Sequence, residues 1–185
     1  WLPGGSLLPE LAFVDESGAP FDARRLQGRW TYVFFGFASC PDICPTTLAT
    51  LASVRSSLRD LPTALQPEVL LVTVDPSRDD ATTLAPYVRH FDPAFHAVTG
   101  NEASLARLAS ALGAAYARVP LTGGGYTMDH TSRLFLIGPD GRLVATSGAL
   151  WASASCTFKV TGSACACLMS SSGRSSQYCA RLFAS

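Results

Sequence analysis

The sequence predicts an α/β fold, in which helices flank a mixed β-sheet and an extra β-hairpin lies at the N-terminus. Continuous apolar runs, typical of strands buried on both faces, alternate with segments whose apolar residues recur every three or four positions, as in amphipathic helices. The alternating part closes on two short strands joined by a Gly-Pro-Asp-Gly turn. A chain of 185 residues, 48% of them apolar, is long enough to bury the core of one such domain.

The first elements are a hairpin, a strand and a helix. The hairpin is expected over residues 11–30, because an apolar stretch is followed there by the turn sequence Asp-Glu-Ser-Gly. Residues 32–37 form an apolar and aromatic run typical of a central strand. The helix after Pro45 has apolar residues at helical spacing as far as Leu61, and a proline near its start costs no hydrogen bond.

The next strand and helix are predicted from the same two kinds of apolar pattern. Residues 69–74, Val-Leu-Leu-Val-Thr-Val, predict a second buried strand. The apolar spacing after it predicts a helix that ends at Phe91. Because proline is tolerated only in the first helical turn, Pro86 places the start of this helix at about Thr82–Thr83.

The last elements complete a mixed sheet. A strand at 96–99 precedes a helix that Asn101 caps and Gly113 ends. A Gly-rich loop at 122–126 then separates the expected strands, which lie at 116–119, 132–137 and 142–146. This order of elements is that of a thioredoxin-like fold with an extra N-terminal hairpin.

Charge and cysteine content divide the chain into two parts. All fourteen acidic residues and all but three of the basic ones lie in residues 1–150, which we take as the folded domain. Residues 151–185 form an atypical tail rich in Ser, Ala and Cys, in which only Ser175–Ala184 has helical spacing and could supply a last helix. The net charge of zero argues against binding to nucleic acid or to a membrane surface.

Two cysteines carry the main chemical signal. Cys40 and Cys44 lie four residues apart at a strand-to-helix junction, so a shared helical turn would place both thiols on one face. The positive end of the helix dipole is expected to lower the thiol pKa and favour thiolate. Such a pair suits a soft metal ion or a reversible disulfide. Thioredoxin-type redox pairs have two intervening residues, and a structural zinc site would need four ligands, so both of these alternatives are less favoured.

A two-thiolate metal site needs a further ligand, and the chain has three histidines. His90 ends a helix and is expected to be a surface residue. His96 opens a strand and is also expected to have no role in a site. His130 lies between the Gly-rich loop and the 132–137 strand. That strand is expected beside 32–37, which would bring His130 to the cysteines. Two sulfurs and one imidazole are soft enough to select Cu(I) over harder ions.

Five blocks of the sequence, in order, resemble the SCO/SenC family. They are Phe34–Pro45 (FFGFASCPDICP), Val74–Asp79 (VDPSRD), Val98–Gly100 (VTG), Met128–Ser132 (MDHTS) and Leu136–Gly141 (LIGPDG). The resemblance implies a thioredoxin-like copper chaperone that helps assemble the dinuclear copper centre of cytochrome c oxidase. It also implies that Cys40, Cys44 and His130 are the copper ligands.

The resemblance leaves two functions open. The first is a metallochaperone that carries Cu(I), with Cu(II) left open, to the copper site of oxidase subunit II, and Asp129 would orient the His130 ring. The second is a thiol–disulfide reductase that uses Cys40 and Cys44 alone to keep the oxidase cysteines reduced. A peroxiredoxin-like peroxidase is disfavoured, because Phe37 stands where a Thr is expected three residues before the nucleophile.

The resemblance also implies a compartment and further partners. Family members are tethered by an N-terminal helix, and this sequence begins at Trp1 without a signal-peptide pattern, so we expect a leader or anchor to precede it in the full-length protein. The expected location is the bacterial periplasm, or the mitochondrial intermembrane space in a eukaryote. Other copper chaperones or thiol reductases are expected as additional partners.

Overall fold

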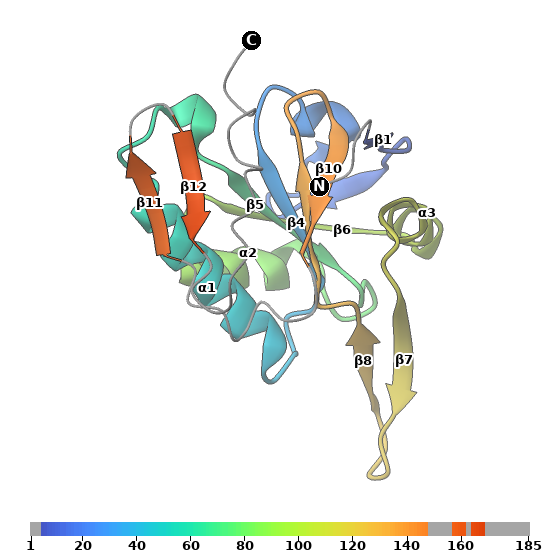
Figure 1. The fold of residues 1–185 in the computed structure, drawn as a ribbon. Helices are drawn as coiled ribbons and strands as arrows, with labels where there is room; N and C mark the ends of the chain where they lie inside the picture. The colour runs from blue at the N-terminus through green and yellow to red at the C-terminus, as the bar shows by residue number, and fades with distance from the viewer. Residues whose placement is uncertain (1–4, 148–156, 162–163, 169–185) are drawn as a thin grey trace. The chain divides into compact units, whose positions relative to one another are not determined.

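A computed structural model of the chain describes residues 5–147, 157–161 and 164–168. The chain divides into two units, Trp1–Ser147 and Gly148–Ser185. The first unit contains an eight-stranded mixed sheet, a separate two-stranded hairpin and three α-helices (Figure 1). Among the described residues, no helix has the length and apolar character needed to cross a membrane.

The strands of the first unit are β1 (Ser6–Leu7), β2 (Phe13–Asp15), β3 (Pro20–Phe21), β4 (Thr31–Gly36), β5 (Glu68–Thr73), β6 (Phe95–Gly100), β7 (Tyr116–Pro120), β8 (Tyr126–His130), β9 (Leu134–Ile137) and β10 (Arg142–Thr146). Its helices are α1 (Ile43–Ser57), α2 (Ala81–Phe91) and α3 (Glu102–Leu112), with the short 3-10 helices η1 (Ala23–Leu26) and η2 (Thr63–Leu65).

The large sheet has the strand order β1-β10-β9-β4-β5-β6-β2-β3. Strands β4, β5 and β6 are parallel, whereas β9 runs antiparallel to β4 and β2 antiparallel to β6. Helices α1 and α2 lie on one side of the sheet and α3 on the other (Figure 1). The structure therefore confirms the predicted mixed sheet, the N-terminal hairpin β2–β3, and the position of β9 beside β4.

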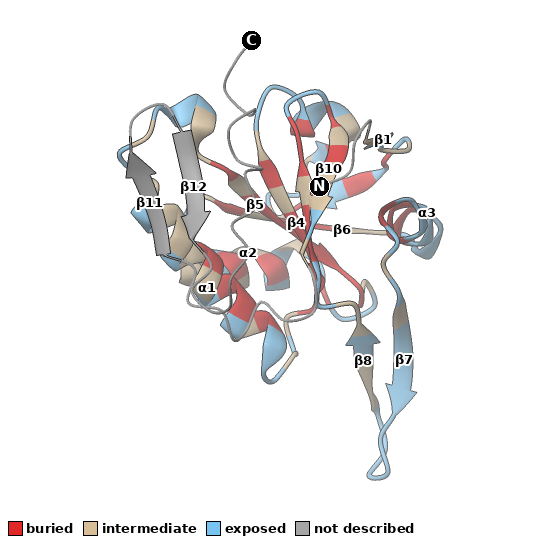
Figure 2. Ribbon diagram, viewed as in Figure 1, coloured by how far each residue is buried: buried red, intermediate tan, exposed pale blue. Residues whose placement is uncertain are grey.

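The core is built around the central parallel strands. Phe34, Phe35 and Leu71 are fully buried, and they alternate faces along β4 and β5 so that both sides of the sheet are packed. Figure 2 shows the buried residues concentrated on these strands and on the inward faces of the helices. Because β4 is held by strands on both sides and layers on both faces, its carboxyl end is a rigid platform.

Helix α2 begins earlier than the sequence predicted. The Asp80 side chain accepts a hydrogen bond from the Thr83 N–H and caps the helix, which therefore starts at Ala81. Pro86 consequently lies in the second turn, where the prediction had placed it in the first. The ring removes the hydrogen bond to the Thr82 carbonyl, but Thr82 is exposed and water can satisfy that group.

The β7–β8 hairpin differs from the prediction around His130. The strand at 116–120 is as expected, but residues 126–130 form a partner strand, with Tyr116 opposite His130. The Gly-rich turn lies at 121–125, close to the predicted loop at 122–126. His130 is the last residue of β8, whereas the prediction placed it between the Gly-rich loop and the next strand and included no strand over 126–130. Antiparallel pairing with β7 satisfies the backbone of this segment.

The second unit contains β11 (Thr157–Thr161) and β12 (Ala164–Leu168), which pair antiparallel. These strands were not predicted. Strand β12, Ala-Cys-Ala-Cys-Leu, lacks the β-branched and aromatic residues that favour strands. The predicted last helix at Ser175–Ala184 lies outside the described residues.

Candidate metal centre

The candidate site begins where β4 ends. After Gly36 the chain turns, and the Cys40 N–H donates to the Phe37 carbonyl at 3.2 Å. Cys40 is half-buried in this turn, while Cys44 is fully buried in the first turn of α1. The backbone of Gly36 packs so closely against Cys44 that a Cβ added to Gly36 would lie 3.0 Å from the Cys44 Sγ. The rigid end of β4 thus fixes the place of the buried thiol.

Only one of the two cysteines is helical. Helix α1 starts at Ile43, so Cys40 precedes it, and the condition under which a shared helical turn would place both thiols on one face is not met. The predicted lowering of the thiol pKa is wrong for Cys44. Burial raises the pKa of Cys44 well above its usual range, and the hydrogen-bonding contact with the Cys40 thiol raises it further. Desolvation outweighs the helix dipole because the sulfur has no access to solvent.

His130 reaches the cysteines from the end of β8. Its Nε2 lies 3.3 Å from the Cys44 Sγ, and its Nδ1 lies 3.2 Å from the Thr131 carbonyl oxygen. A carbonyl can only accept, so Nδ1 carries the proton and Nε2 presents its lone pair to the thiol. The ring meets Phe34 and Phe37 edge-on, with centroids 5.9 and 5.8 Å away. Burial lowers the pKa of His130, which keeps the imidazole neutral.

The three predicted ligand residues therefore come together. One donor atom from each of Cys40, Cys44 and His130 lies within 4.8 Å of the others. Two sulfurs and one neutral imidazole nitrogen face a common point, and the aromatic rings around them limit access of water. A soft ion could be held there by all three donors with small side-chain adjustments.

The other residues considered as candidates do not join the cluster. His90 is exposed at the end of α2. His96 lies on β6, with its Nδ1 3.0 Å from a carboxylate oxygen of Glu16. Asp129 is exposed, and the ring nitrogen that it was expected to orient is bonded to the Thr131 carbonyl. His90 thus has the predicted surface position, and the half-buried His96 is paired with Glu16 away from the cysteines.

Comparison with known proteins identifies the family. The SCO1/SenC family matches residues 4–161 of the chain. The chain belongs to the SCO1/SenC family. A protein of Stutzerimonas stutzeri, whose name refers to copper binding, is 40% identical to this chain over 142 residues. These residues are 77% of this chain and 69% of that protein. The chain spans 63% to 65% of several SCO2-like proteins of Rickettsia and about half of the mitochondrial SCO2 homologues.

Solved SCO structures share the fold. ScoI of Arabidopsis thaliana with copper bound is 26% identical, has a TM-score of 0.73, and is matched over 78% of this chain and 89% of its own. BsSco is described as a member of the Sco family of cytochrome c oxidase assembly proteins with a disulfide switch. It matches with a TM-score of 0.60 over 78% of this chain and 84% of its own, and at 21% identity it supports the fold alone.

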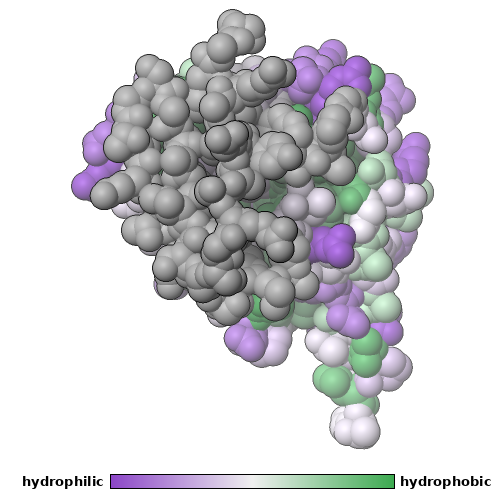
Figure 3. All heavy atoms as spheres, viewed as in Figure 1, coloured by the Kyte–Doolittle hydropathy of each residue, from purple (hydrophilic) through white to green (hydrophobic). Residues whose placement is uncertain are grey.

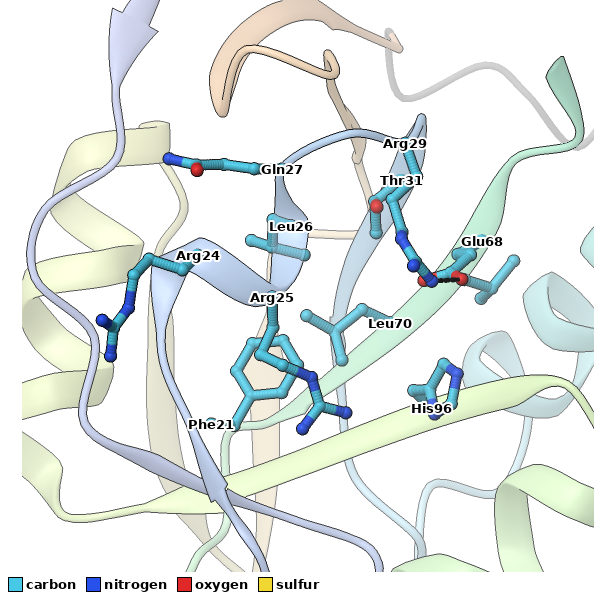
Figure 4. Close-up of a pocket in the computed structure, with 11 residues that line it drawn as sticks. Phe21, Arg24, Arg25, Leu26, Gln27, Arg29, Thr31, Glu68, Leu70 and His96 are labelled. Carbon is cyan, nitrogen blue, oxygen red and sulfur yellow. Dashed lines mark hydrogen bonds and ion pairs between the residues drawn. The ribbon is translucent and has the colours of Figure 1, made fainter. Parts of the chain in front are cut away.

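A pocket of about 350 Å³ lies at the opposite end of the parallel strands (Figure 4). It opens at the amino ends of β4 and β5 and is lined by three arginines and His96. Each of these cations already has an acidic partner: Arg24 with Asp22, Arg25 with Asp15, Arg29 with Glu68, and His96 with Glu16. The charge of these basic side chains is therefore neutralised locally.

Sequence reasoning missed the residues that hold the ligands in place. The Thr131 carbonyl and the rings of Phe34 and Phe37 orient His130, but nothing in their spacing marks them as such. The buried Asp79 holds the segment before Cys40, since its carboxylate accepts a hydrogen bond from the Ala38 N–H at 2.9 Å. The available signal was the Val74–Asp79 block, which matched the SCO/SenC pattern without an assigned role.

Proposed function

We propose that this SCO1/SenC protein is a copper metallochaperone. It binds Cu(I) through Cys40, Cys44 and His130 and delivers it to the dinuclear copper centre of cytochrome c oxidase. The observation that carries the proposal is the convergence of two sulfurs and one imidazole nitrogen, all within 4.8 Å of one another. Structures of SCO proteins with copper bound support the choice of metal.

The donor set matches the chemistry of Cu(I). Thiolate and imidazole are soft or borderline ligands, and Cu(I) is stable with few ligands, whereas a structural zinc site needs four. The neutral His130 ring offers Nε2 without first losing a proton there. Copper binds the two sulfurs as thiolates and so displaces any thiol proton. The raised pKa of Cys44 means that this thiol keeps its proton until the metal binds.

Delivery requires that the metal can leave. Cys40 is only half-buried, so a partner's thiolate or imidazole can approach the ion from its side and take it by ligand exchange. Exposed apolar side chains near the site and on the hairpin, namely Ile43, Val119 and Leu121, give a partner a surface to contact. Figure 3 shows hydrophobic residues exposed on the projecting hairpin. The proposed partner is subunit II of the oxidase, in the periplasm.

A second function is favoured by the unequal exposure of the two thiols. The half-buried Cys40 can attack a disulfide of the oxidase copper site, and the buried Cys44 can then resolve the mixed disulfide. Two electrons pass to the target, which becomes a dithiol, and this protein is left with a Cys40–Cys44 disulfide. A thiol reductase must then reduce it. Only the reduced pair binds copper, so both functions can operate in one protein.

The histidine separates these two functions experimentally. In His130→Ala, disulfide exchange should persist, because exchange requires only the two thiols and access to them. Affinity for Cu(I), measured by competition with a chelator, should fall by more than about 100-fold, since even residues that only support a ligand typically cost about 10–100-fold. His90→Ala, which removes an exposed histidine, is the matched control and should bind as the wild type does.

In cells, the chaperone function predicts that His130→Ala fails to support oxidase assembly at low copper. Cys40→Ser should fail as well, because it lacks both metal binding and exchange. Full rescue of oxidase assembly by His130→Ala, alongside failure of Cys40→Ser, would refute the metallochaperone and leave the reductase.

A further inference from the structure

The loop after β5 contacts both halves of the site. This loop, Asp75–Asp79, which we name the brace loop, is folded on itself, since the Asp79 N–H donates to the Asp75 carbonyl at 2.9 Å. On the cysteine side, the Asp79 carboxylate accepts hydrogen bonds from the Ala38 N–H at 2.9 Å and from the Thr73 hydroxyl at 2.7 Å. Asp79 and Asp75 are both buried, which makes these contacts hard to exchange for water.

On the histidine side, the brace loop contacts Tyr126. The Tyr126 hydroxyl donates to the Asp75 carboxylate at 2.9 Å, and an Arg78 guanidinium N–H donates to the Tyr126 carbonyl at 3.2 Å. The Tyr126 ring lies between two guanidinium groups, those of Arg78 and Arg118, each 4.0 Å from the ring centroid. Arg78 is also ion-paired with Asp75. Tyr126 thus has four polar and cationic contacts, three of them made by the brace loop.

These contacts matter because the β7–β8 hairpin is not part of the large sheet. Within the described residues, β7 and β8 pair only with each other, so no ladder of backbone hydrogen bonds sets their position relative to β4. Tyr126 begins β8 and His130 ends it, about 13 Å further along at the usual rise of a strand. The Tyr126 contacts fix the start of the strand. Together with the Phe34 and Phe37 rings, and with the connection through residues 131–133 to β9, they limit where His130 can lie at its other end.

We propose that Tyr126 is a positioning residue for His130, and that the brace loop sets the distance between the cysteine turn and the histidine hairpin. This inference rests on the proposed copper site. Without the Tyr126 contacts, the hairpin would spend time in positions where Nε2 is away from the two sulfurs. Affinity for the three-ligand site falls in proportion to the fraction of molecules with His130 in place, so a hairpin displaced for nine tenths of the time would weaken Cu(I) binding about tenfold.

The test compares substitutions on β8. Tyr126→Leu removes both the stacked ring and the hydroxyl, and should lower Cu(I) affinity about tenfold. Tyr126→Phe keeps the ring between the two arginines and loses only the hydrogen bond to Asp75, so it should recover most of the affinity. Thr127→Leu places the same new side chain one position along and is the matched control, since Thr127 makes no side-chain hydrogen bond within the described part of the chain.

Two readouts separate positioning from a general loss of structure. X-ray absorption at the copper edge should show a weakened nitrogen contribution in Tyr126→Leu with the sulfur contribution unchanged. The Cys40–Cys44 disulfide should still form on oxidation, because the hairpin supplies neither thiol. Failure to form this disulfide, or a loss of sulfur ligands, would overturn the proposal.

The decisive comparison uses His130→Ala as background. If Tyr126 acts through His130, Tyr126→Leu should have no further effect on Cu(I) affinity once the imidazole is gone. An undiminished tenfold loss in that background, or wild-type affinity of Tyr126→Leu itself, would refute positioning. The copper site itself fails by a different result, namely wild-type affinity of His130→Ala, so the two failures can be told apart.

Discussion

Replacing Gly36 with alanine should disturb both the fold and the buried thiol. A Cβ at this position would lie 3.0 Å from the Cys44 Sγ, from a Leu71 methyl and from the Phe34 ring, so its neighbours must move by a few tenths of an ångström. All three neighbours are fully buried and cannot relax into solvent. Overpacking of this kind costs about 1–3 kcal/mol, and the lower chain entropy of alanine offsets about 0.5–1 kcal/mol of it. A net loss of about 1–2 kcal/mol corresponds to a melting temperature lower by roughly 2–8 °C.

The assay is thermal unfolding of the reduced, metal-free protein, followed by chelator competition for Cu(I). Gly36→Ala should melt earlier and bind copper more weakly, because Cys44 is pushed from its place. Gly123→Ala is the control: nothing lies within 4 Å of its added Cβ and its φ is not positive, so stability should change by less than about 0.5 kcal/mol. If Gly36→Ala has the melting temperature and the Cu(I) affinity of the wild type, β4 does not pack closely on Cys44.

Three further outcomes follow from the structure. Thr31→Val should raise the free energy of unfolding by about 1 kcal/mol in urea titrations, since the buried Thr31 hydroxyl has no hydrogen-bond partner; a destabilised variant would mean that the hydroxyl is bonded. Glu16→Gln should cost less than about 1 kcal/mol, because the His96 side chain of the pair is partly exposed. Burial raises the pKa of Glu16 but hydrogen bonds from His96 and the Ala97 N–H bring it below 4.5, while the bond to Glu16 raises the pKa of His96 above 6.5 despite burial. The stability difference between wild type and Glu16→Gln should therefore be largest between pH 4.5 and 6.5 and shrink as pH rises through the pKa of His96; a difference that does not shrink above pH 6.5 would exclude the ion pair. Oxidation to the Cys40–Cys44 disulfide should abolish stoichiometric Cu(I) uptake, as mass spectrometry and metal analysis of the same sample would show, whereas retained uptake would place the site elsewhere.

The sequence predicted the elements whose signals are local and periodic. The apolar runs of β4 and β5, the spacing along α1, and the Asn101 cap and Gly113 stop of α3 all specify backbone conformation within a few residues. The pairing of β9 with β4 was also predictable, because the order of strands and helices leaves few topologies. It is this pairing that suggested the approach of His130 to the cysteines.

What the sequence could not predict depends on tertiary contacts. Strand β8 has no strong alternation of apolar and polar residues, since it is held by side chains such as Tyr126 and not by burial of a face. The pKa of Cys44 depends on burial, which overrode the helix dipole expected from its position. The start of α2 depended on Asp80, whose cap prevailed over the preference of Pro86 for the first turn.

The central claim is that one Cu(I) is bound by two sulfurs and one nitrogen. X-ray absorption at the copper edge, on reduced protein loaded with one equivalent of Cu(I), tests it most directly. We expect two sulfur neighbours from Cys40 and Cys44 and one imidazole nitrogen, with the nitrogen contribution lost in His130→Ala. A spectrum with sulfur neighbours alone, or with nitrogen and oxygen alone, in the wild-type protein would contradict it.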